Sequence, residues 1–96
     1  MLRLNRSPGE ALVIEAPAGR VRLLVTAVTN RGATFEIQSP DGSEIAIRRY
    51  GENFRLKFTG DAVLIELTAN QHRRTVGLRI DAPRSWPVVR EEIIIP

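Results

Sequence analysis

The sequence predicts an all-β domain, a small barrel or sandwich of about nine or ten short antiparallel strands. A chain of 96 residues has room for one domain. Residues that favour turns interrupt it at short intervals, and the runs between them are rich in Val, Ile, Leu, Thr and Phe. The interrupting segments are Ser7-Pro8-Gly9, Pro17-Ala18-Gly19, Asn30-Arg31-Gly32, Pro40-Asp41-Gly42, Gly51, Thr59-Gly60-Asp61, Asn70-Gln71 and Pro83.

Apolar residues alternate with polar ones inside these runs, which is the period of a half-buried strand. No window of about 11 residues shows a helical i, i+3, i+4, i+7 stripe free of breakers. We therefore expect strands throughout. The alternating residues are Leu2 and Leu4; Val21, Leu23, Val25 and Ala27; Phe35 and Ile37; Ile45 and Ile47; Val63, Ile65 and Leu67; and Val76, Leu78 and Ile80.

An internal repeat divides the single domain of residues 1–96 into copy one, about 1–50, and copy two, about 51–96. Residues 20–49 and 61–92 both read as a long strand, a turn, a strand, a proline loop and a short strand. The pairs that match are Leu23 with Val63, Pro40 with Pro83, and Arg49 with Arg90. Two β meanders can also resemble each other by chance. If the repeat is real, each copy buries its apolar face against the other.

The composition excludes several classes of site. The chain has no cysteine and a single histidine, His72, so disulfides, thiolate zinc sites and a cysteine nucleophile are absent. His72 lies in a polar turn, where an exposed role is expected. Glu91 and Glu92 are adjacent and point to opposite faces of a strand, so they cannot form a carboxylate pair. We expect no enzyme activity, no metal and no cofactor.

Localisation and partner class follow from hydropathy and charge. No apolar run approaches the roughly 20 residues of a membrane span, and the first residues lack the apolar core of a signal peptide. We expect a cytoplasmic protein that is not bound to a membrane. The net charge is +3, and 13 of the 14 basic residues are arginine. Arginine suits phosphate and bases, so an anionic partner is indicated, with an ordinary solvated surface as the alternative.

Both ends of the chain carry motifs of one protein family. The opening MLRLNRSPGEALVI has Leu2 and Leu4, Arg6 and Gly9-Glu10 before an apolar strand. The close VGLRIDAPRSWPVVREEI has Gly77, Ala82-Pro83, Arg84 and the run Val88 to Glu92. In this order the two segments resemble the first hairpin and the last two strands of the carbon storage regulators (CsrA/RsmA), which are bacterial RNA-binding translational regulators.

The resemblance implies an unusual architecture. Members of the family are intertwined homodimers in which each RNA site joins the first strand of one subunit to the last strand of the other. This chain resembles a fused, single-chain version of that dimer, with a true homodimer as the alternative. We expect one opening strand, Leu2–Arg6, and two closing strands, residues 45–49 and 88–92. Residues 54–58 better resemble the second strand of copy two than another opening strand. The C-terminal helix that is usual in the family is expected to be missing.

The family function is binding of GGA-containing single-stranded or hairpin-loop RNA, in an mRNA leader near the ribosome-binding site or in a small regulatory RNA. A protein antagonist is a further possible partner. The resemblance places the RNA site at Leu4, Arg6, Arg84, Val88, Val89 and Arg90, and a second or degenerate site at Ile47, Arg48 and Arg49.

Other interpretations of these residues stay open at this point. Leu4 and Val88 are equally suited to a core, Arg84 to solvent, and Arg90 to an ion pair with a neighbouring glutamate. Trp86 either stacks on a base or packs against Pro83 and Pro87. The alternative function is a protein-interaction module with degenerate RNA sites, and a DNA-binding β module is a third possibility.

Overall fold

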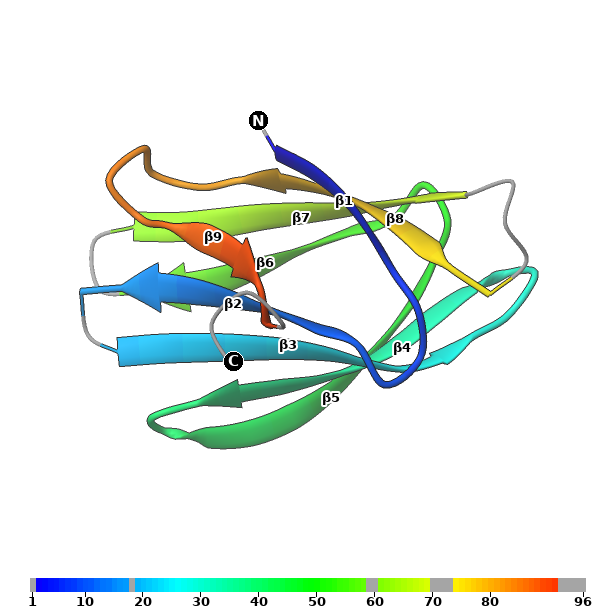
Figure 1. Cartoon of the computed structure of the whole chain (residues 1–96), viewed down its shortest axis with the longest axis horizontal. Helices are drawn as coiled ribbons and strands as arrows, with labels where there is room; N and C mark the ends of the chain where they lie inside the picture. The colour runs from blue at the N-terminus through cyan, green and yellow to red at the C-terminus, as the bar shows by residue number, and fades with distance from the viewer. Residues whose placement is uncertain (1, 18, 59–60, 70–73, 92–96) are drawn as a thin grey trace.

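The computed structural model is a sandwich of two antiparallel sheets and describes residues 2–17, 19–58, 61–69 and 74–91 (Figure 1). The all-β class and the predicted number of short strands are confirmed, and the two sheets do not close into a barrel. The nine strands are β1 (Leu2–Arg6), β2 (Ala11–Ala16), β3 (Gly19–Val28), β4 (Gly32–Ser39), β5 (Gly42–Arg49), β6 (Asn53–Phe58), β7 (Asp61–Ala69), β8 (Val76–Asp81) and β9 (Val88–Arg90).

Strand exchange between the two halves of the chain defines the topology. The four-stranded sheet has the order β1-β8-β7-β6, and the five-stranded sheet has the order β5-β4-β3-β2-β9. β1 therefore leaves its chain neighbour β2 and pairs with β8, whereas β5 remains beside β4. Each sheet contains three consecutive strands of one half and the first strand of the other half. The five-stranded sheet also contains β9.

The core lies between the two sheets and is formed by alternate residues of the strands. These inward positions are almost fully buried, and the residues between them face solvent, as a period of two requires. The rings of Phe35 and Phe54 meet across the interface with centroids 5.5 Å apart at 45°. The core includes Leu12, Ile14, Val21, Leu23, Val25, Phe35, Ile37, Phe54, Leu56, Val63, Ile65, Leu67, Val76, Leu78 and Ile80.

Two equivalent turns reveal the true period of the repeat. Gly9 and Gly51 both have a positive φ, 88° and 87°, which glycine adopts without strain. Their amides donate to the carbonyls of Val25 and Leu67 at 2.8 and 2.9 Å. In each turn a glutamate accepts a bond from the backbone three residues earlier. Glu10 Oε1 bonds the Ser7 amide at 2.7 Å, and Glu52 Oε1 bonds the Arg49 amide at 2.6 Å.

The turns therefore align β1 with β5 at a spacing of 42 residues, which corrects the sequence-based repeat. The expectation of a single opening strand is wrong, because β5 pairs with β4 as β1 pairs with β8. The copies meet near residue 41 and not near residue 50. Arg49 is the counterpart of Ser7 and not of Arg90, and Leu23 is the counterpart of Ile65 and not of Val63.

The closing strands also differ from the expectation. After β4 the chain turns at Pro40 and Asp41 directly into β5, whereas after β8 a longer loop leads to β9. β9 pairs with β2, and none of the described strands pairs with the equivalent free edge of β6. Residues 45–49 are therefore not a closing strand, and β9 has no described counterpart.

Two expectations concern residues outside the described part of the chain. The expected absence of a C-terminal helix concerns residues 92–96, and His72 lies in residues 70–73, so both fall outside the described residues. In the part of the chain that the structure describes, no helix has the length and apolarity needed to cross a membrane.

Candidate nucleic-acid interface

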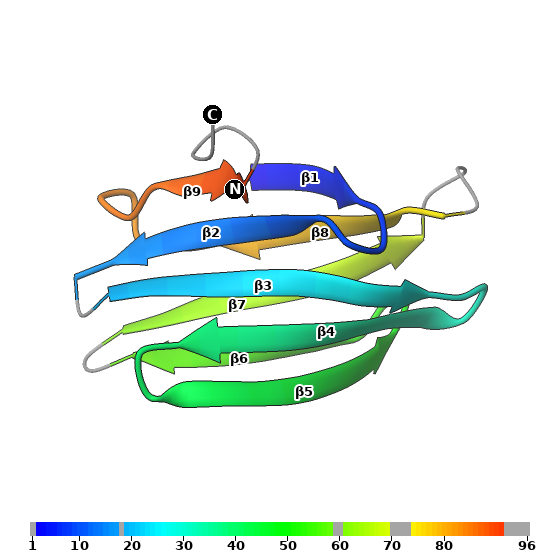
Figure 2. The ribbon, with the colours of Figure 1, turned by 60° about the horizontal axis from the view of Figure 1, so that its bottom comes forward.

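The first and last strands lie along the same border of the sandwich. β1 is the outer strand of the four-stranded sheet and β9 is the outer strand of the five-stranded sheet. Figure 2 shows them along one border, with β5 and β6 along the opposite one. The two segments that carry the family-like motifs are thus neighbours, and among the described strands each presents one unpaired backbone edge. Such an edge offers amide and carbonyl groups to a ligand.

A surface hollow of about 250 Å³ lies between these strands, and we call it the β1–β9 hollow. Its lining combines apolar side chains with exposed polar groups, and Arg84 supplies a cation. The loop before β9 is held in place by two backbone hydrogen bonds. Trp86 N donates to Pro83 O at 2.9 Å, and Glu15 N donates to Pro87 O at 2.8 Å. The lining residues are Leu2, Ile80, Ala82, Pro83, Arg84, Trp86 and Val88.

Most of the predicted closing-strand residues lie at this border. Val88 is half-buried, packs against the core and also lines the hollow. Arg84 and Arg90 are exposed. Val89 lies opposite Val13 on the outer face, away from the hollow's side of β9. Arg90 lies opposite Leu12, at the far end of β9 from the loop.

The opening-strand residues are placed differently. Leu4 is half-buried against the core, and Leu2, which the sequence analysis did not select, lines the hollow instead. Arg6 is 5% exposed, so its assignment as a surface RNA contact is wrong. Because side chains alternate along β1, Arg6 shares the inner face with Leu2 and Leu4. Its guanidinium donates to the carbonyls of Asn5 at 2.7 Å and Ala11 at 3.3 Å.

The residues of the predicted second site lie at the opposite border, on β5. Ile47 and Arg49 are exposed, and Arg48 stacks over the Phe54 ring at 5.5 Å while donating to Ile47 O at 2.8 Å. Arg48 is the counterpart of Arg6, since each donates to the carbonyl that precedes it. These residues belong to an opening strand, and none of the described strands completes a site beside them.

Trp86 packs in the core, which is the structural alternative of its two expected roles. It is 8% exposed and belongs to the core cluster, so its ring does not stand free for stacking. An edge of the residue still lines the β1–β9 hollow, next to Pro83 and Arg84. The ring is therefore buried, as the packing interpretation predicts, with the core cluster around it.

A second hollow, of about 500 Å³, lies on the outer face of the four-stranded sheet, and we call it the β1–β8 hollow. Arg3 and Arg79 lie directly opposite each other in it, an arrangement of like charges that costs stability unless an anion or acid compensates. Glu66 bonds Arg79 at 3.0 Å and neutralises one of them. The lining residues are Arg3, Leu4, Asn5, Thr68, Ala69, Gly77, Leu78 and Arg79.

Gly77 gives this hollow its floor. A side-chain carbon at this position would lie 2.2 Å from Thr68 Oγ1 and 3.5 Å from Asn5 Oδ1, so only glycine leaves the space between them open. The β1–β8 hollow was not predicted from the sequence. The alternation of Arg3 and Asn5 with Leu2 and Leu4 was the available signal, because it places two polar side chains together on the outer face of β1.

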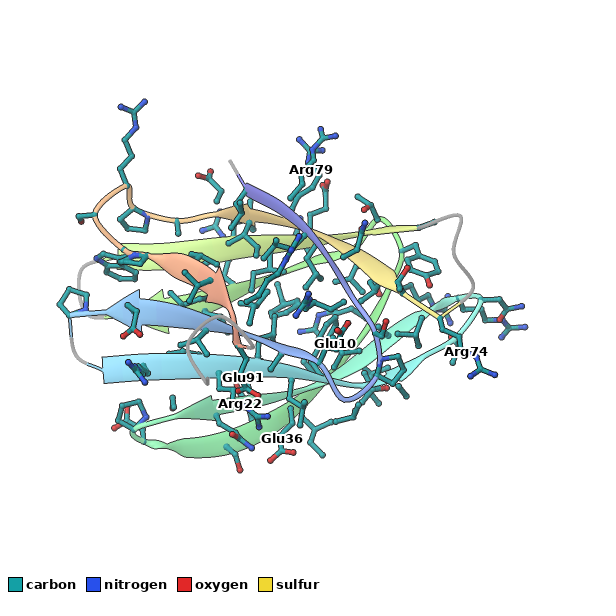
Figure 3. All side chains as sticks on the ribbon, in the orientation of Figure 1. Glu10, Arg22, Glu36, Arg74, Arg79 and Glu91 are labelled. Atoms are coloured by element: carbon teal, nitrogen blue, oxygen red, sulfur yellow. The ribbon has the colours of Figure 1, made fainter. Side chains whose placement is uncertain are left out.

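An ion pair fixes the end of β9 to the centre of its sheet. The carboxylate of Glu91 accepts two bonds from Arg22, from Nε and from Nη2, the latter at 2.9 Å. This hydrogen-bonded carboxylate raises the pKa of Arg22 above its ordinary value. Arg22 also donates to Gln38 at 3.2 Å. Figure 3 shows Arg22, Glu91 and Glu36 together, with Arg79 on the other side of the sandwich.

Comparisons with protein-family models, with curated proteins and with solved structures gave no match to the chain. The chemistry of the interface therefore has to be judged from its own residues. It offers exposed cations, a hollow of mixed polar and apolar lining and, among the described strands, two unpaired strand edges on one border.

Proposed function

We propose that the chain is a non-catalytic, cytoplasmic RNA-binding regulator of translation that binds GGA-containing single-stranded or hairpin-loop RNA at the β1–β9 hollow. It would act, as in the carbon storage regulators that its ends resemble, by occupying an mRNA leader near the ribosome-binding site. The observation that carries the proposal is the shared hollow of Leu2, Arg84 and Val88, because it unites the two motif-bearing ends of one chain.

The chemistry of the hollow suits a splayed base. Recognition of single-stranded RNA uses apolar or aromatic surface for the base, polar groups for the base edge and cations for the phosphates. Leu2, Val88 and the exposed edge of Trp86 supply the apolar surface. The unpaired backbone edges of β1 and β9 supply donors and acceptors, and Arg84 supplies charge beside them.

Further cations extend the interface in both directions. Arg90 is exposed on β9, and Arg3 is exposed on the outer face of β1 beside Arg79. An RNA strand that crosses the edge of β1 would bring a phosphate to the like-charged pair Arg3 and Arg79. Because Glu66 already pairs with Arg79, the phosphate would be bound chiefly by Arg3. The β1–β8 hollow is thus the proposed continuation of the RNA path.

The test is a calorimetric titration of the protein with a short GGA hairpin and with an RNA that carries two such hairpins. One hairpin is expected to bind per chain, because none of the described strands lies beside β5 as a closing strand. The protein is kept dilute enough to be monomeric, so that the two-hairpin RNA gains none of the avidity of linked sites, which can reach about 10². Two hairpins bound per monomeric chain would contradict the single-site proposal.

Salt separates the proposal from the protein-interaction alternative. RNA binding through several phosphates is expected to weaken steeply as salt is added, since counterions are released on binding. A protein interface that buries apolar surface changes little with salt. Competition with duplex DNA tests the third possibility, and tighter binding of the duplex would favour it.

A further inference from the structure

The free edge of β5 has the properties of a strand that pairs with another strand. β5 is the terminal strand of the five-stranded sheet and runs for 8 residues without proline or lysine. Its pairing with β4 is continuous from Gly42 to Arg49, with no bulge to twist the edge away. Natural edge strands usually carry such protective features. β5 lacks proline, lysine and a bulge, but Glu44, Arg48 and Arg49 put charge on it, so a partner strand has to match these charges as well as the backbone groups.

Two isoleucines mark the same edge. Ile45 and Ile47 are 72% and 70% exposed, although isoleucine is among the most commonly buried residues. The residues next to them on β4 are polar, because Ile45 lies opposite Glu36 and Ile47 opposite Thr34. The exposed apolar surface is therefore confined to the edge strand. A partner that extends the sheet beside β5 would cover it, whereas one on the open face of the sheet would meet polar side chains.

The side chains of β5 are complementary to a second copy of the same strand. If two β5 strands pair antiparallel about a two-fold axis at Ala46, Ile45 of each copy lies opposite Ile47 of the other. On the inner face, Glu44 of each copy then lies opposite Arg48 of the other, and unlike charges oppose each other twice. Cross-strand apolar pairs and opposite charges are the contacts that stabilise antiparallel pairing.

The charges of β5 are available for this arrangement. Glu44 is exposed and has no ion pair with any residue that the structure describes. Arg48 is partly exposed, and its guanidinium lies over the Phe54 ring of the other sheet and donates to Ile47 O at 2.8 Å, so Glu44 of a second copy has to reach it beside these contacts. A two-fold interface needs this kind of self-complementary surface.

We propose that two copies of the chain associate through antiparallel pairing of their β5 strands, with the register centred on Ala46. The paired sheets form one continuous sheet of ten strands across the dimer. The β1–β9 hollow lies on the opposite border of the sandwich, so the dimer leaves it open and presents two hollows facing away from each other (Figure 2). The proposal does not depend on RNA binding.

Sedimentation velocity and light scattering over protein concentration test the proposal. The mass is expected to rise from 10.7 kDa towards twice that value between about 1 and 500 µM, since a single strand pair is a small interface. Glu44→Arg and Arg48→Glu each place like charges opposite each other twice. Each is expected to weaken dimerisation roughly tenfold or more.

The charge-exchanged double variant, Glu44→Arg with Arg48→Glu, decides the register. It restores unlike charges across the two-fold axis and is expected to restore dimerisation. Asp81→Arg is the matched control, an exposed acid on a strand away from the edge, and it is expected to leave the dimer unchanged. Far-ultraviolet circular dichroism establishes that each variant is folded.

Three results would overturn the proposal. They are a wild-type mass of one chain at every concentration, a dimer that Glu44→Arg does not weaken, and a folded double variant that stays monomeric. Ile45→Lys gives an independent readout, because a charge on the edge opposes strand pairing without touching the ion pair. A folded Ile45→Lys variant that still dimerises like the wild type would also contradict it.

Discussion

The opening strands β1 and β5 occupy equivalent places in the fold and present opposite chemistry to solvent. On the outer face, β1 carries Arg3 and Asn5, and β5 carries Ile45 and Ile47 at the same two positions. The facing strands differ in the same sense, since Arg79 lies opposite Arg3 and Glu36 lies opposite Ile45. At these outer-face positions β1 and its neighbour are cationic and polar, whereas β5 and its neighbour are apolar and acidic, although Arg48 and Arg49 add cations elsewhere on β5.

The inner faces of the two strands differ much less. Leu4 lies opposite Leu78 in one half, and Ala46 lies opposite Phe35 in the other. Two medium side chains are thus replaced by one large and one small side chain, which fills a similar volume. Packing constrains the interior of both halves in the same way, whereas their surfaces are free to diverge. Function has to be sought in the divergent surfaces.

The largest expected effect comes from the interior. Phe35→Ala removes a fully buried ring that contacts Phe54, and the cavity is expected to cost about 3–5 kcal/mol of unfolding free energy. Ile45→Ala, on the adjacent strand but 72% exposed, is expected to change stability by at most about 0.5 kcal/mol. Urea denaturation measures both.

The equivalence of the two inner faces can be tested in the same assay. Phe35→Leu opens space and Ala46→Leu overfills it, so each alone is destabilising. Together the two substitutions make this cross-strand pair two leucines, as Leu4 and Leu78 are in the other half. The double variant is expected to lose less stability than the sum of the single variants. Additive losses would show that the halves do not share one packing solution.

The next effect concerns the difference between the two borders in RNA binding. Arg90→Ala is expected to weaken hairpin binding by about 1–3 kcal/mol, the usual loss for an arginine contact to RNA. Arg49→Ala removes an equally exposed arginine from β5, where no closing strand lies alongside, and is expected to change affinity little. Fluorescence anisotropy measures both, and equal losses would show that the RNA site is wrongly placed.

The sequence allowed the fold class to be predicted, because burial on one face of each strand imposes a period of two on the residues. The exchange of β1 and β5 between sheets was missed. Gly51-Glu52 repeats the Gly9-Glu10 turn, but the residues before it, Ile45 and Ile47, do not resemble those of β1. Alternation also could not show that Arg6 is inside, because arginine is normally solvated and its burial depends on carbonyl groups brought near by the turn.

The two equivalent turns test whether the copies are alike, with a smaller stability cost that is expected to be the same at both turns. Gly9→Ala and Gly51→Ala both force a side chain into a positive φ in open space, so strain alone is expected to cost about 1–2 kcal/mol in each case. Because the two turns share their hydrogen bonds, the costs are expected to agree closely in thermal or urea unfolding. A loss at one turn only would mean that the two copies are not equivalent in solution.

The smallest effect comes from the ion pair that holds β9, the strand without a counterpart. The side chains of Arg22 and Glu91 are 33% and 20% exposed, so a double-mutant cycle with Arg22→Ala and Glu91→Ala is expected to give a coupling of about 0.5–1 kcal/mol. The exposed pair of Arg20 and Glu15 in the same sheet is the control, with a coupling near the lower end of that range. The folded-state pKa of Arg22 is raised, so the stabilisation by this ion pair is complete at neutral pH and is lost only as the pH rises through that value.

Hydrogen exchange locates the effect, since loss of the ion pair is expected to speed exchange of the β9 amides bonded to β2 and to leave those of β4 and β5 unchanged. Uniform acceleration over both sheets would indicate that β9 is part of the global folding unit and is not a separately anchored strand.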